Sequence, residues 1–145
     1  MDITLLLADS AQVADGKLYI LGGGWSVTGP DPVPSAIAIK LQLSGAELDR
    51  VHHWELFLED SDGRLVTWET PDGPQELVVR GDVMASTNPD APKGVPVDVP
   101  LAVNFGPIQL NGGERYVWRF QVEGERLPGA SAAFSVRSRR AAPGA

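Results

Sequence analysis

Apolar residues recur at every second position along much of the chain. The alternation is clearest at positions 37–43, 54–58, 101–105 and 118–122. A period of two buries one face of a β-strand and leaves the other face in water. The pattern therefore predicts a chain built from short strands.

Glycine paired with aspartate or asparagine separates these runs. The pairs lie at 15–16, 62–63, 72–73 and 111–113. Such residues accept the positive φ values that tight hairpins require. We expect one hairpin to join 54–59 to 64–68, and a second to join 3–8 to 17–21.

No stretch predicts a long helix. The best candidate, 44–50, would form about two turns, and the twelve prolines and sixteen glycines of the chain would interrupt anything longer. The strand spacing predicts a single antiparallel β-sandwich of about eight or nine strands, of immunoglobulin-like, C2-like or jelly-roll type. We expect this domain to span 1–136, with 88–100 as a proline-rich crossing loop and 137–145 as a flexible, disordered basic tail.

The composition of the chain excludes several classes of function. The chain has 145 residues and no cysteine, which excludes disulfides, thiolate catalysis and cysteine-bound metals. Its formal charge is −7, although Arg137, Arg139 and Arg140 gather near the C-terminus. An acidic surface repels phosphate backbones, so we expect no nucleic-acid partner. With no apolar run near the roughly 18 residues of a membrane span, and an acidic residue at Asp2, we expect no membrane partner and a cytoplasmic location.

One stretch joins a predicted strand to three consecutive glycines and a tryptophan, Gly22, Gly23, Gly24 and Trp25. A phosphate-binding loop needs such glycines before a helix, but strand-like residues and Gly29-Pro30 follow here. The pattern instead favours a bend or bulge, or the close approach of another backbone. We take these four residues as the candidate binding residues, because an exposed tryptophan on a β-sandwich can dock a partner.

The segment LLLADSAQVADGKLYILGGGWSVTG, at positions 5–29, resembles the opening of a family of small uncharacterised bacterial proteins. An alanine-aspartate pair, a glutamine-valine pair, a turn and a glycine-rich tryptophan segment follow one another in the same order. That family has no assigned activity. The resemblance therefore implies a stand-alone cytoplasmic domain and carries over no catalytic residues.

The two histidines, His52 and His53, are adjacent and would point to opposite faces of a strand. His52 shares a face with apolar residues, so we expect it to be a hydrogen-bonded residue at the rim of the core. His53 and Glu55 share the other face and would need a third ligand to hold a metal. No serine lies in a G-x-S-x-G elbow, so a catalytic triad has no support, and we expect no cofactor.

Acidic residues cluster at the turn that holds Asp60 and Asp62. When the turn is aligned with the ligand positions of an EF-hand loop, Leu58 falls at the first position and offers no side-chain oxygen. Strands rather than helices are predicted on both sides of the turn. The pattern favours a solvated turn whose carboxylates accept hydrogen bonds from free amides. Calcium binding by acids from several turns stays open as the alternative.

The segments 3–8 and 17–21 have little polar surface on either face. A strand buried on both sides of a small sandwich needs a second cover, either a loop or another subunit. This feature predicts a homo-oligomer formed along that sheet.

Together these observations predict a non-catalytic binding or interaction module that associates with itself and with protein partners, its ligand unknown. The first alternative is a small-molecule or sugar-active enzyme, or a metal-binding protein, that uses His53 and the turn carboxylates. The second is a structural subunit of a larger, phage-like assembly, in which Arg137, Arg139 and Arg140 dock on an acidic partner.

Overall fold

The structure is a computed structural model, and it describes residues 1–139. Within this range the chain is all-β, which confirms the predicted class: it has twelve strands and one 3-10 turn at Gly45–Glu47, where the sequence predicted about eight or nine strands. The difference comes from short strands with few apolar residues, such as β4 (Val27–Thr28) and β7 (Thr67–Thr70). No helix in the described range is long and apolar enough to cross a membrane.

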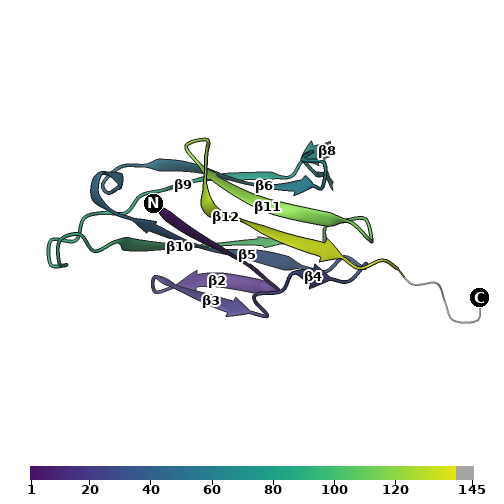
Figure 1. The fold of residues 1–145 in the computed structure, drawn as a ribbon, viewed down its shortest axis with the longest axis horizontal. Coiled ribbons are helices and arrows are strands. Elements are labelled where there is room, and N and C mark those ends of the chain that lie inside the picture. The colour runs from purple at the N-terminus through teal and green to yellow at the C-terminus, as the bar shows by residue number, and fades with distance from the viewer. Residues whose placement is uncertain (140–145) are drawn as a thin grey trace, which may run out of the picture.

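Two larger sheets form the body of the molecule (Figure 1). The three-stranded sheet has the order β1 (Asp2–Ala8), β5 (Ser35–Leu43), β10 (Val97–Phe105). The five-stranded sheet has the order β4, β12 (Glu125–Val136), β11 (Arg115–Val122), β6 (His52–Asp60), β9 (Val78–Val83). All neighbours are antiparallel except β4, which runs parallel to β12.

A single hydrophobic core joins the two larger sheets. Ile37, Ile39 and Leu41 of β5 are fully buried in the same cluster as Leu56 of β6 and Phe120 of β11. Each such side chain contributes about 1.5–3 kcal/mol by leaving water. Trp54 and Trp118 also belong to this cluster, as their apolar faces predicted.

The hairpin predicted between 3–8 and 17–21 is wrong in its pairing. β1 pairs with β5, whereas β2 (Ser10–Ala14) pairs with β3 (Lys17–Leu21). The reason is the turn: Asp15 and Gly16 have φ of 51° and 70°, so this two-residue turn places Ala14 opposite Lys17. Only the five residues before the turn can then pair with the strand after it.

The hairpin predicted between 54–59 and 64–68 forms only at its turn. Leu65 makes a bridge to Glu59, and the Val66 amide donates to the Leu58 carbonyl. Beyond this point the chain leaves β6, and β7 pairs instead with β8 (Gly73–Glu76). The proline-rich loop predicted at 88–100 is wrong in its bounds: a loop covers 84–96, whereas 97–100, including Pro100, belong to β10 at the edge of its sheet.

The described residues include the first three of the predicted tail. The Arg137 amide donates to the Thr28 carbonyl at 2.9 Å, and Arg139 contacts Asp31. Arg140 and the rest of the tail, residues 140–145, lie outside the described range.

Candidate functional site

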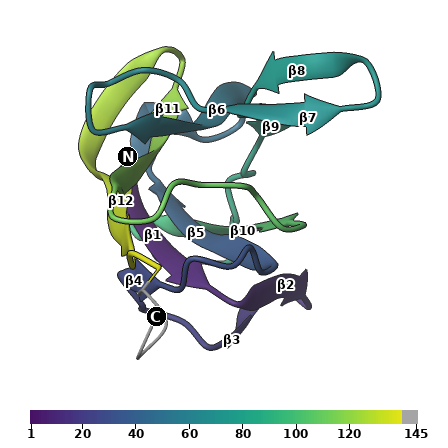
Figure 2. The same ribbon diagram turned by 90° about the vertical axis from the view of Figure 1, so that its right-hand side faces the viewer.

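The β2–β3 hairpin forms a third tier on the outer face of the three-stranded sheet. In both ribbon views β2 lies nearer the sheet and β3 is the outermost strand (Figures 1 and 2). Ala11 of β2 joins a buried cluster with three alanines of the sheet beneath it, Ala8, Ala36 and Ala38. Their small side chains allow the hairpin to approach β5 and β10 closely. Thr4 and Leu6 on the outer face of β1 remain exposed, so the hairpin does not supply the second cover that the sequence predicted along 3–8.

Asn104 of β10 holds the hairpin at its inner edge. Its side-chain oxygen accepts a hydrogen bond from the Ala11 amide at 3.2 Å, and its side-chain nitrogen donates to the Ala11 carbonyl at 2.7 Å. The carboxamide therefore satisfies the Ala11 amide and carbonyl in the way that the backbone of a neighbouring strand would. Sequence reasoning missed this residue; the available signal was an asparagine that alternates with the buried or half-buried apolar residues of its strand.

These contacts define which backbone groups of β3 remain free. Ala11 directs its amide and carbonyl towards Asn104, so its pair with Ile20 is one of the non-hydrogen-bonded pairs of the antiparallel ladder. Leu18, two residues before Ile20, is in the same position opposite Val13. The amides and carbonyls of Leu18 and Ile20 therefore point to the outer edge, where no other described strand pairs with β3.

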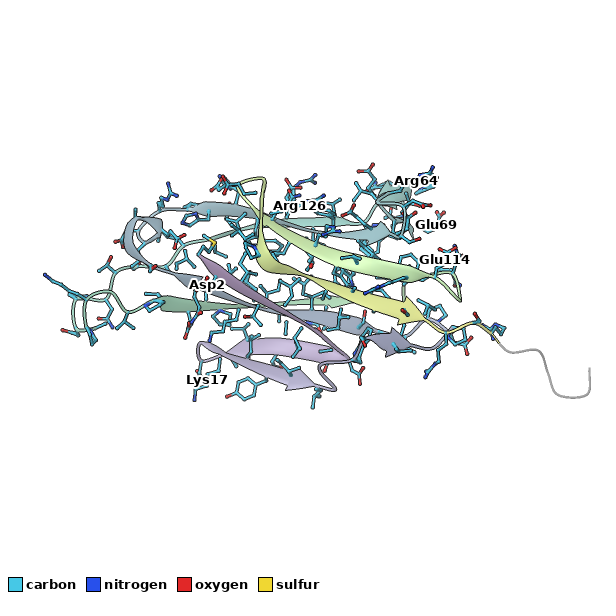
Figure 3. The ribbon with its side chains drawn as sticks, in the orientation of Figure 1. Asp2, Lys17, Arg64, Glu69, Glu114 and Arg126 are labelled. Carbon is cyan, nitrogen blue, oxygen red and sulfur yellow. The ribbon has the colours of Figure 1, made fainter. Side chains whose placement is uncertain are left out.

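The hairpin also exposes apolar side chains. Tyr19 is 52% exposed and Leu21 is 70% exposed, and Val13 and Ile20 on the other face are exposed at 43% and 37%. We call these four residues the hairpin surface. A hollow of about 490 Å³ adjoins it, lined by both strands and Asn104. Figure 3 shows Lys17 extending from the same hairpin, on the side of the molecule opposite Arg126.

The three glycines permit a close approach between this hairpin and β1. Gly22 has φ of 59°, and a side chain there would overlap the Asp9 carboxylate. A Cβ on Gly23 would lie 2.7 Å from Ile20 Cγ2. Gly24 has φ of 89° and its amide donates to the Leu7 carbonyl at 2.7 Å. The segment is a bend, as the sequence favoured, and it brings the chain after β3 back against Leu6 and Leu7 of β1.

Trp25 lies at the rim of the core rather than on the hairpin surface. Its ring meets Phe134 edge-on, with centroids 5.8 Å apart, and it lines a cavity of about 40 Å³ that it shares with Trp118 and Leu58. The indole nitrogen is buried with no partner among the described residues. A cavity of this size holds about one water molecule, not an organic ligand.

The two histidines face opposite ways, as predicted. His52 is 1% exposed and its Nε2 donates to the Glu47 carbonyl at 2.7 Å. His53 is exposed and its Nδ1 contacts the Asp82 carboxylate on β9. The hydrogen bond with Asp82, followed by the negative charge of that carboxylate, raises the pKa of His53 above 6.5.

The turn carboxylates do not join His53. Asp60 lies at the other end of β6, seven residues along a strand, or roughly 23 Å at the usual rise. Its side chain accepts hydrogen bonds from the amides of Asp62 and Arg64, both at 2.9 Å, which is the solvated turn that the sequence favoured. Among residues 1–139, no three histidine, aspartate or glutamate side chains are grouped to hold a metal ion.

A second charged cluster lies on the outer face of the five-stranded sheet. Glu59 is 7% exposed and contacts Arg119, with Arg126 at 3.7 Å. Two guanidinium groups thus compensate one buried carboxylate, which is how a folded chain tolerates a buried charge. The arrangement is an ion-pair network in which the Glu59 carboxylate is already paired with two arginines.

The family comparison agrees with the expected membership in an uncharacterised family. A family described as "Family of unknown function (DUF6941)" matches residues 3–137, which include both larger sheets and the hairpin. A search of curated proteins found no match.

Proposed function

We propose a function for this chain, which belongs to the family of unknown function DUF6941: it is a non-catalytic interaction module that associates with itself through the hairpin surface. We read the two sheets that share one core as a β-sandwich, which serves as the scaffold. The hairpin is the part that meets the partner, and the Gly22–Trp25 segment positions it.

The observation that carries this proposal is that β3 has exposed apolar side chains and an unpaired outer edge. It is the outermost strand, it exposes Tyr19, Ile20 and Leu21, and it has an unpaired edge. Natural proteins usually protect such an edge with proline, charge or a bulge, because it can pair with another chain. Apolar side chains beside an open edge are the features of a strand-addition interface.

The other clusters support binding less well than the hairpin does. His53 and Asp60 lie at opposite ends of β6, so an active site built from both has no common centre. The cavity beside Trp25 is too small for a substrate. Neither arrangement brings a nucleophile to a base, which acyl transfer would require.

Sedimentation equilibrium tests the proposal. We expect the unmodified chain to form dimers at micromolar concentrations, because contacts of limited area are usually weak. Tyr19→Glu should weaken the association about tenfold or more, since it replaces an exposed apolar side chain of the hairpin surface with a charge. The matched control is Val51→Glu, which adds the same charge at an exposed position just before β6. Equal weakening by both variants, or a chain that stays monomeric throughout, would contradict the proposal.

A further inference from the structure

The geometry points to one arrangement for the self-association, and this inference rests on the proposed function. We infer that β3 of one copy pairs with β3 of a second copy as an antiparallel strand, about a two-fold axis that passes beside Tyr19. The two hairpins then form one four-stranded sheet, β2-β3-β3-β2.

The free backbone groups set this register. In an antiparallel ladder, two residues that direct their amide and carbonyl towards the partner strand face each other and exchange both hydrogen bonds. Leu18 and Ile20 are the residues of β3 with outward groups. When Leu18 of one copy faces Ile20 of the second, the reverse pair forms by symmetry. Four hydrogen bonds result, and Tyr19 faces Tyr19 at the centre.

The side chains agree with the same register. Tyr19 faces its own copy in a non-hydrogen-bonded pair, the type in which side chains approach most closely, and aromatic cross-strand pairs are favourable. The pairing also places Lys17 opposite Leu21 of the second copy. Leu21 leads directly into Gly22, where the Asp9 carboxylate lies. Each Lys17 therefore reaches an opposite charge, once on each side of the axis.

Charge complementarity at this edge matters because the chain as a whole is acidic. Two copies of formal charge −7 repel one another at long range. The proposed register opposes this repulsion at one point of the contact, since it brings Lys17 of each copy towards Asp9 of the other, although the turn of each hairpin adds a second acidic residue, Asp15.

Four other sheet edges are protected in ways that β3 is not. β1, an edge of the three-stranded sheet, packs beside β12, where the Ile3 carbonyl lies close to Gly129. β10 contains Pro100, which cannot donate to an added strand. β9 carries Arg80 and Asp82, both largely exposed. β4 is only two residues long. β3 has five residues without proline, and its one charged residue, Lys17, is at its beginning. These differences favour β3 over these four edges as the strand that accepts a second copy.

Disulfide trapping tests the register, and the chain suits it because it contains no cysteine. Residues in a central non-hydrogen-bonded pair have Cα atoms about 4.5 Å apart, within the range of a disulfide. Tyr19→Cys should therefore give a covalent dimer under mild oxidation. Gln12→Cys, on the inner strand of the same hairpin, is the control. We expect Tyr19→Cys to cross-link more than about tenfold faster, because pairing raises its effective concentration.

A mixing experiment keeps Tyr19 in place. Lys17→Cys and Leu21→Cys should cross-link to each other when mixed, and neither should readily cross-link to itself. A dimer by sedimentation in which Tyr19→Cys reacts no faster than Gln12→Cys, and in which the mixed pair does not form, would overturn this register but leave the proposed function standing. A chain that sediments as a monomer would overturn both.

Discussion

At the residue scale, adjacent histidines of the same strand have separate environments. His52 is part of the core rim and is held by a carbonyl of the 3-10 turn, whereas His53 is exposed and paired with a carboxylate of β9. The alternation of the strand predicted these directions. It could not predict Glu47 or Asp82 as partners, because neither contact is encoded near the histidines in a recognisable pattern.

The His53–Asp82 pair gives a prediction for pH dependence. Because the pKa of His53 is raised in the folded state, the pair stabilises the fold below about pH 6.5, the usual histidine value. That contribution is lost as the pH rises through the raised pKa. In Asp82→Asn, the pKa of His53 measured by NMR titration should fall towards 6.5, whereas Glu69→Gln should leave it unchanged. An unchanged pKa in Asp82→Asn would show that the contact does not exist in solution.

At the element scale, local signals predicted strands and turns better than pairing. The Asp15-Gly16 turn was recognised, but its two-residue geometry fixes the hairpin to β2 and β3, and β1 pairs with a strand about thirty residues later. Pairing between distant strands depends on the whole core, so alternation in one strand does not reveal its neighbour. The glycines of 22–24 could be interpreted as a bend from sequence, but the role of Asn104 required knowing which strand lies beneath the hairpin.

Asn104 gives the prediction at this scale. Asn104→Ala removes both hydrogen bonds to Ala11 and leaves a partly buried amide and carbonyl without partners, so we expect a loss of about 1–3 kcal/mol in the free energy of unfolding. Urea denaturation measures this loss, and faster hydrogen exchange at the Ala11 amide should accompany it. Gln42→Ala, which loses an exposed hydrogen bond to Asp98, should change stability by less than about 0.5 kcal/mol. Equal effects would show that Asn104 does not hold the hairpin.

At the scale of the whole molecule, the chain forms three layers: the two larger sheets and the β2–β3 hairpin. The two larger sheets share the core, and the hairpin packs on β5 and β10 at the outer face of the smaller sheet (Figure 2). The sequence predicted a second cover along 3–8 and a chain that associates with itself. The outer face of β1 stays exposed, and the exposed apolar residues of β3 are the surface that we propose for self-association.

Hydrogen exchange of two backbone amides, measured by NMR at several protein concentrations, directly tests whether β3 pairs with β3 of a second copy. We predict that the amides of Leu18 and Ile20 exchange rapidly in dilute solution and become protected together as the concentration rises through the dimerisation range. The Tyr19 amide, which already faces β2, should change much less. Rapid exchange of Leu18 and Ile20 in a solution that sedimentation shows to be dimeric would contradict the account.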